Sequence, residues 1–67
     1  MIILKAGDDG ADVRLSGDEL DMLNNALNEL CNGVHIEDWE FRTRIGWDRA
    51  TVNKLLDQIH QAAPNAN

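Results

Sequence analysis

The chain has 67 residues with 6 basic and 12 acidic side chains, which give a formal net charge of −6 at pH 7. This length suits one domain, residues 1–67, and a hydrophobic content of 43% is typical of a folded rather than a disordered chain. The longest apolar run, Met1–Leu4, is far shorter than the ~20 residues of a transmembrane helix and lacks the flanks of a signal peptide, so we expect no membrane partner. Because the lone cysteine, Cys31, cannot close an intramolecular disulfide, we expect a cytoplasmic protein.

Residues 1–15 are typical of a β-hairpin. Ile2–Ala6 is short and β-branched, Gly7–Gly10 is a cluster of turn formers, and Asp12–Leu15 alternates polar and apolar side chains. The first strand does not alternate, because Ile2–Leu4 is apolar throughout. We therefore expect one face or the outer edge of this strand to be covered, and a homodimer through Ile2–Leu4 is one way to cover it.

Residues 16–33 predict a helix with a clear beginning and end. Ser16 and Glu19 have the spacing of a capping box, in which each side chain bonds the backbone N–H of the other residue. One apolar stripe follows at helical spacing and consists of Leu20, Leu23, Leu27 and Leu30. Gly33 comes just after the stripe, so we expect it to end the helix in the left-handed conformation.

Residues 38–63 predict two further helices. Asp38–Ile45 fits a short helix that Gly46 ends, and Asp48 is a suitable N-cap for the helix that follows. That helix ends before the tail, residues 64–67, which we expect to be frayed. The expected fold is α+β, with an N-terminal two-stranded β-hairpin followed by a three-helix domain in the order β-β-α-α-α.

The apolar positions of these elements predict the hydrophobic core. Cys31 is expected to be a small buried hydrophobe, and Trp47 falls at a position that helix packing should bury. Trp39 fits either the core or a binding surface, where tryptophan is also enriched. The expected core residues are Leu4, Val13, Leu15, Leu20, Leu23, Leu27, Leu30, Val34, Ile36, Trp39, Phe41, Ile45, Trp47, Val52, Leu55, Leu56 and Ile59.

The sequence has no pattern that is typical of catalysis or of metal binding. Ser16 is the lone serine and serves as a helix cap, while His35 and His60 lie in different predicted elements. Cys31 and His35 lack the second pair of ligands that a four-ligand zinc site requires. A chain of this size also has little volume for an enclosed pocket of ~300 Å³ or more. We expect no enzymatic activity, no metal site and no cofactor.

Residues 38–57 resemble the helix-turn-helix unit of bacterial regulators. Gly46 stands at the turn, and the family's buried positions are occupied by Phe41, Ile45, Trp47, Val52 and Leu55. The resemblance implies a DNA-binding transcriptional regulator in which Arg49, Asn53 and Lys54 face the major groove.

The charge layout favours a different kind of partner. Residues 1–36 carry two basic and seven acidic side chains, whereas residues 37–67 carry four and five. DNA-binding domains are usually basic, so nucleic acid is a partner only under the helix-turn-helix alternative. The polar side of the helix at 16–33 combines acidic residues with asparagine, a poor helix former. Its expected contact residues are Asp18, Asp21, Asn25, Asn28, Glu29 and Asn32.

This polar row has two interpretations, a solvated helix face or a surface for a basic protein. Charge complementarity speeds the encounter of such partners. The hypothesis that follows is a small acidic binding module, of the inhibitor or immunity type, which neutralises a basic, nucleic-acid-acting partner such as a toxin. Asp8, Asp9 and Asp12 of the hairpin form a second acidic patch under this hypothesis. A small adaptor that acts by self-association is a further alternative.

Overall fold

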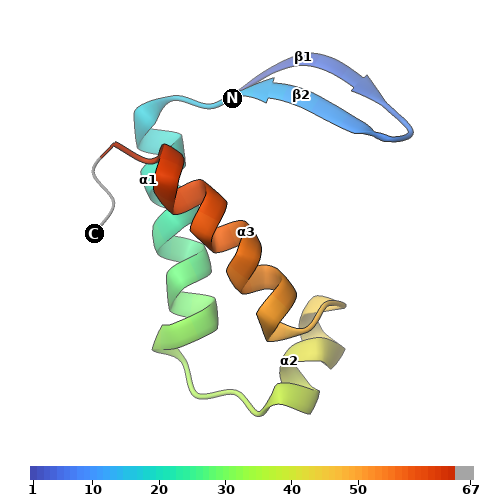
Figure 1. Cartoon of the computed structure of the whole chain (residues 1–67), viewed down its shortest axis with the longest axis vertical. Helices are drawn as coiled ribbons and strands as arrows, with labels where there is room; N and C mark the ends of the chain where they lie inside the picture. The colour runs from blue at the N-terminus through green and yellow to red at the C-terminus, as the bar shows by residue number, and fades with distance from the viewer. Residues whose placement is uncertain (65–67) are drawn as a thin grey trace.

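The computed structural model describes residues 1–64, in which a β-hairpin is followed by helices (Figure 1). The strands β1 (Ile2–Gly7) and β2 (Gly10–Arg14) pair antiparallel around a tight turn. The helices are α1 (Gly17–Asn28), continued by the wider turn η1 (Glu29–Gly33), then α2 (Asp38–Ile45) and α3 (Arg49–Ala62). The predicted α+β fold in the order β-β-α-α-α is confirmed. Apart from Pro64, the tail that was expected to fray lies outside the described residues.

Capping interactions set the starts of α1 and α3 and the end of α2, as the sequence predicts. The Glu19 N–H donates to Ser16 Oγ at 3.1 Å and the Ser16 N–H donates to Glu19 Oε1 at 2.9 Å, so the capping box of α1 is confirmed. At α3 the Thr51 N–H donates to Asp48 Oδ1 at 2.8 Å, and hydrogen bonding from Thr51 holds the pKa of the Asp48 carboxyl below its ordinary value. Gly46 ends α2 in the left-handed region with a φ of 86°.

The end of the first helix differs from the prediction. Gly33 is predicted as a left-handed C-cap, but its φ is negative and it lies inside η1. The Val34 N–H donates to the Glu29 carbonyl at 3.0 Å. This bond, made by the wide turn, satisfies one of the carbonyls at the helix end that a left-handed C-cap would otherwise satisfy. The Glu29 carboxylate lies in the space that a Cβ on Gly33 would take.

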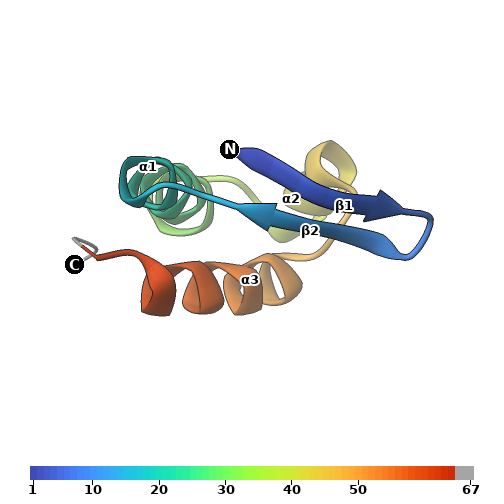
Figure 2. The ribbon, with the colours of Figure 1, turned by 90° about the horizontal axis from the view of Figure 1, so that it is seen from above.

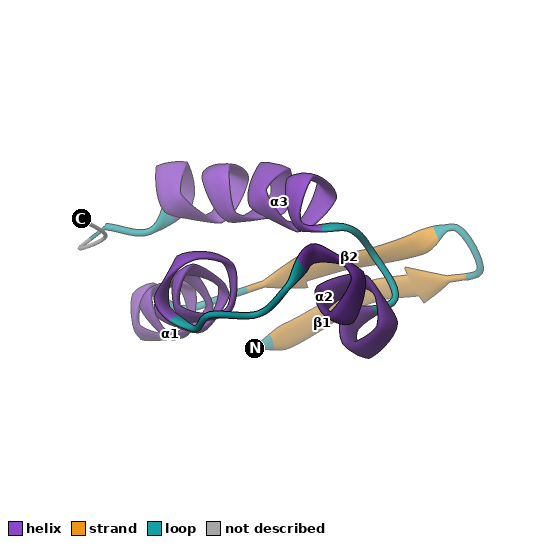
Figure 3. Ribbon diagram, turned by 90° about the horizontal axis from the view of Figure 1, so that it is seen from below, coloured by secondary structure: helices purple, strands orange, loops and turns teal. Residues whose placement is uncertain are grey.

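The core lies where α3 packs across α1 and α2 (Figure 3). Phe41 of α2 is fully buried there. Around it lie the buried Cys31, Val52 and Leu56 and the half-buried Leu27, Leu30 and Ile36. Burial raises the pKa of the Cys31 thiol, and the prediction that this cysteine is a small buried hydrophobe is confirmed.

The hairpin stands apart from the helices (Figure 1). Every residue from Ile2 to Arg14 is exposed, and within residues 1–64 neither strand packs against a helix. The prediction that the first strand is covered is therefore wrong within one chain, and Leu4 and Val13 do not belong to the core. The physical reason is that the pattern of a strand indicates which side chains share a face but not whether another element packs on that face.

Several predicted core residues of the helical part are exposed as well. Trp47, expected to be buried, is 66% exposed because it follows Gly46 in the link between α2 and α3 and lies on neither helix. Trp39, which by sequence fits either the core or a binding surface, is 71% exposed. The other exposed members are Leu23, Val34, Ile45 and Leu55. The molecule measures 36 × 32 × 14 Å, and so thin an arrangement of elements leaves many side chains with solvent on one side.

Candidate protein-binding surface

The polar side of the first helix is divided between an outer face and a groove. We define the outer face by Asp18, Asn25 and Glu29, which are exposed and share one stripe at helical spacing. Asn28 and Asn32 instead line a groove of about 250 Å³ between α1–η1 and α3. Asp21 is half-buried and takes part in an interaction within the fold. The predicted row of contact residues thus spans two surfaces of the same helix.

The groove, which we call the amide groove, collects amide side chains from two helices. Its lining consists of Asn24, Asn28, Asn32, Asn53, Leu56, Asp57 and His60. The Asn32 Nδ2 donates to Asn28 Oδ1 at 3.0 Å. Each of these two amides has a second polar atom that is not used in this bond.

Asn24 is a member of the amide groove that sequence reasoning misses. It is only 4% exposed, and its Oδ1 lies 3.2 Å from His60 Nδ1, a distance at which an Nδ1-protonated ring donates a hydrogen bond. This contact offsets the cost of burying an amide. A signal was present in the sequence, because Asn24 lies four residues after Leu20 and three before Leu27 and so shares their apolar stripe.

Negative charge dominates this side of the molecule. Between Arg14 and Arg42 the sequence contains no lysine or arginine and seven acidic residues. Both α1 and η1 fall within this stretch, so the outer face contains no basic side chain from its own helix. Asp57 adds a carboxylate from α3 on the opposite wall of the amide groove. The outer face and the groove together form one acidic, amide-rich surface.

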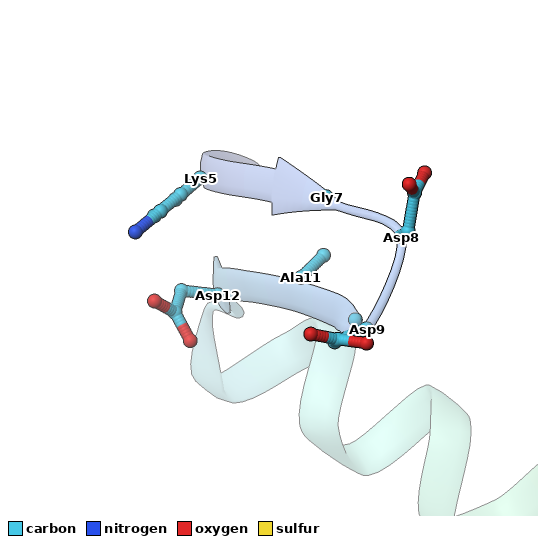
Figure 4. Close-up of a pocket in the computed structure, with 7 residues that line it drawn as sticks. Lys5, Gly7, Asp8, Asp9, Ala11 and Asp12 are labelled. Carbon is cyan, nitrogen blue, oxygen red and sulfur yellow. The ribbon is translucent and has the colours of Figure 1, made fainter.

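The second predicted acidic patch is less coherent than the first. Figure 4 shows Asp8 pointing away from Asp9 and Asp12 at the tip of the hairpin. Asp12 lies opposite Lys5 in the register of the two strands, so a positive charge stands beside it. We therefore place the main candidate surface on the first helix and not on the hairpin.

Arg49, a predicted base-reading residue, is bonded within the fold. Its Nη1 donates to the Cys31 carbonyl at 2.8 Å, its Nη2 donates to the Ile36 carbonyl, and its Nε donates to Asp38 Oδ1 at 3.2 Å. The guanidinium carbon lies 4.7 Å from the centre of the Phe41 ring. This side chain is 23% exposed, and it ties η1, the loop that follows and α2 to the start of α3.

The other two predicted DNA contacts have different surroundings. Lys54 is exposed on α3. Asn53 is half-buried and lines both the amide groove and a second hollow that includes Asp38 and Asp48. The structure thus brings Asn53 together with acidic groups, while Arg49 is directed into the fold.

Glu19 forms additional contacts at the start of α1. Its carboxylate pairs with the N-terminal ammonium group of Met1 and accepts the Ser16 N–H. The ammonium group is the larger influence, the backbone N–H of Ser16 the next, and together they lower the pKa of Glu19 to about 2.

We expect the replacement of Glu19 by glutamine to remove a pH-dependent part of the stability. The carboxyl has an ordinary pKa of 4.5 and a folded pKa of about 2, so its contribution is complete above pH 4.5 and is lost as the pH falls to about 2. Glutamine still accepts the Ser16 N–H, so the capping box is retained. Thermal unfolding at several pH values should show the native and Glu19→Gln midpoints converging as the pH falls through this range. A difference that stayed constant would contradict the prediction.

Comparison with known proteins adds no relative: no family model matches the chain, and no curated protein or solved structure is significantly similar to it. Among residues 1–64, no helix is both long enough and apolar enough to cross a membrane. Within the same part of the chain, no three histidine, cysteine or acidic side chains come together as a metal site. A functional assignment therefore depends on the shape and charge of the surfaces described above.

Proposed function

We propose that the protein is a small acidic binding module, of the inhibitor or immunity type, whose partner is a basic, nucleic-acid-acting protein such as a toxin. The observation that carries the proposal is the long stretch between Arg14 and Arg42, which contains no lysine or arginine and includes all of α1 and η1. The proposed contact residues are Asp18, Asp21, Asn25, Asn28, Glu29 and Asn32, with Asp57 across the amide groove.

The chemistry of these side chains suits a basic surface. Aspartate and asparagine have few rotatable bonds, so ordering them against a partner costs less conformational entropy than ordering glutamate or lysine. Carboxylates accept paired hydrogen bonds from arginine, and amides both donate and accept.

A protein that acts on nucleic acid presents a cleft of lysine and arginine to the phosphates. An acidic module competes for the same cations, and long-range attraction raises its association rate. We place this encounter in the cytoplasm, where a free thiol such as that of Cys31 persists.

The proposal is tested with a double variant of the outer face, Asn25→Lys with Glu29→Lys. The matched control is Gln58→Lys with Glu37→Lys, which changes the net charge equally at exposed positions outside α1 and η1. Tagged native and variant proteins are used to capture partners from the host lysate, with and without nuclease digestion. We expect the native and control proteins to retain a basic protein after digestion, and the outer-face variant to recover at least about tenfold less of it.

Each other outcome counts against the proposal. Equal loss with both double variants would show that binding follows net charge alone, and full retention by Asn25→Lys with Glu29→Lys would exclude the assigned face. Far-ultraviolet circular dichroism of each variant establishes that the helices are intact.

The alternative is a helix-turn-helix DNA-binding regulator, and one observation favours it. The left-handed Gly46 joins α2 to α3, and Asp48 caps the second of these helices, as in a helix-turn-helix connection. Nucleic acid captured from the undigested lysate, together with protein partners that vanish on digestion, would support this alternative. In that case Lys54→Ala should weaken DNA binding. The slope of the logarithm of the binding constant against the logarithm of the salt concentration should become shallower by about one.

A further inference from the structure

The chain exposes more surface than a monomer of its size normally does. Its accessible surface is 5323 Å², whereas about 4,200 Å² is expected for a monomeric protein of 7.5 kDa. Its radius of gyration is 13.2 Å, compared with about 11 Å for a typical domain of this length. The surplus of about 1,100 Å² exceeds the ~800 Å² that each partner buries in a standard stable interface.

The hairpin contributes to this surplus because it is solvated on both faces. An isolated two-stranded hairpin is only marginally stable in water, and further strands or packing are needed to stabilise such a sheet. The apolar residues Ile2, Ile3 and Leu4 are 59%, 61% and 66% exposed. An exposed apolar strand at the edge of a sheet is a template for pairing with another chain.

The two edges of the hairpin differ in their charged residues, and β1 also contains a register shift between Ile3 and Lys5. The β2 strand carries Asp12 and Arg14, and charged residues discourage pairing at an edge. In β1 the one charged residue is Lys5, which lies opposite Asp12 within the hairpin. Figures 1 and 2 show β1 as the strand farther from α3, so another chain can approach the outer edge of β1 without meeting this helix.

We propose that two copies of the chain associate through the outer edge of β1. The two β1 strands pair antiparallel about a two-fold axis, and the two hairpins become one four-stranded sheet in the order β2-β1-β1-β2. A second copy fits this edge because an apolar strand is complementary to itself about a two-fold axis. The basic partner proposed above does not fit it, since β1 contains no acidic residue and its charged group is a lysine.

The proposal is tested by sedimentation equilibrium of the full chain from micromolar to millimolar concentration, with Ile3→Glu and Val13→Glu as a matched pair. The two positions lie directly opposite each other, so their side chains share one face of the hairpin, but only Ile3 is on the proposed edge. We expect the native chain to dimerise and Ile3→Glu to weaken the dimer at least about tenfold, because two carboxylates are brought together near the axis. Val13→Glu should have a smaller effect, since its carboxylates are one strand farther from the axis on each side.

Amide hydrogen exchange provides a second readout that does not depend on a substitution. Exchange of the outward-facing amides of β1 should slow as the protein concentration rises, while the outer edge of β2 should exchange at an unchanged rate. A chain that stayed monomeric up to millimolar concentration would overturn the proposal. So would a dimer that Val13→Glu disrupts as strongly as Ile3→Glu, or slowed exchange confined to β2.

Discussion

Replacing Arg49 by methionine should remove a large part of the stability of the helices. The change removes the hydrogen bonds from a charged donor to the carbonyls of Cys31 and Ile36, and bonds of this kind contribute about 1.5–3 kcal/mol each. Because the side chain is 23% exposed, water recovers part of the loss, and we expect the free energy of unfolding to fall by about 2–4 kcal/mol. A core of this size supplies only about 3–5 kcal/mol in all.

Urea denaturation followed by far-ultraviolet circular dichroism measures this loss. Arg44→Met is the matched control, because Arg44 is 64% exposed and pairs with Glu40 across one helical turn at 2.6 Å. That change should lower the free energy of unfolding by no more than about 0.5 kcal/mol. Equal losses in the two variants would contradict the role assigned to Arg49. Because this residue supports the fold, its substitution cannot serve as a test of DNA binding.

Truncating Phe41 to alanine should lower the free energy of unfolding by about 3–5 kcal/mol, the usual cost of removing a large buried aromatic ring. Phe41 is fully buried between α2 and α3, and its loss also removes the ring against which Arg49 stacks. Trp39→Ala on the same helix should change stability by about 0.5 kcal/mol or less, because Trp39 is mostly solvated. Denaturation curves by circular dichroism compare the two variants directly. If Trp39→Ala lowered the free energy of unfolding more than Phe41→Ala did, the assignment of Phe41 as the buried aromatic residue of α2 would be wrong.

Most boundaries of the elements, though not the end of the first helix, could be predicted because the signals that set them are local. Ser16 and Glu19 bond each other's backbone, and Gly46 ends α2 without help from distant residues. Burial could not be predicted in the same way, because it depends on where the elements pack. Leu4 and Val13 have the pattern of core residues, but nothing local states that their hairpin projects away from the helices.

The same distinction applies to the candidate surface. Helical spacing places the predicted contact residues on one helix, but it does not separate the exposed Asp18, Asn25 and Glu29 from Asn28 and Asn32, which line the groove. It does not reveal the amide groove, because the second wall of the groove comes from α3, and the contact between Asn24 and His60 joins residues far apart in sequence. The bonds of Arg49 to the Cys31 and Ile36 carbonyls could not be predicted either. Every residue has a backbone carbonyl, so the sequence does not indicate which carbonyl accepts a bond.

The separation of the hairpin from the helices has a consequence for how the chain unfolds. Within residues 1–64 the strands share no packing with the helices, so the two parts lack the mutual support that makes unfolding all-or-none. A single free energy of unfolding therefore describes the helices alone, and a melting curve recorded on them says nothing about the strands. In practical terms the strands can separate and expose their backbone while the packed core around Phe41 stays intact.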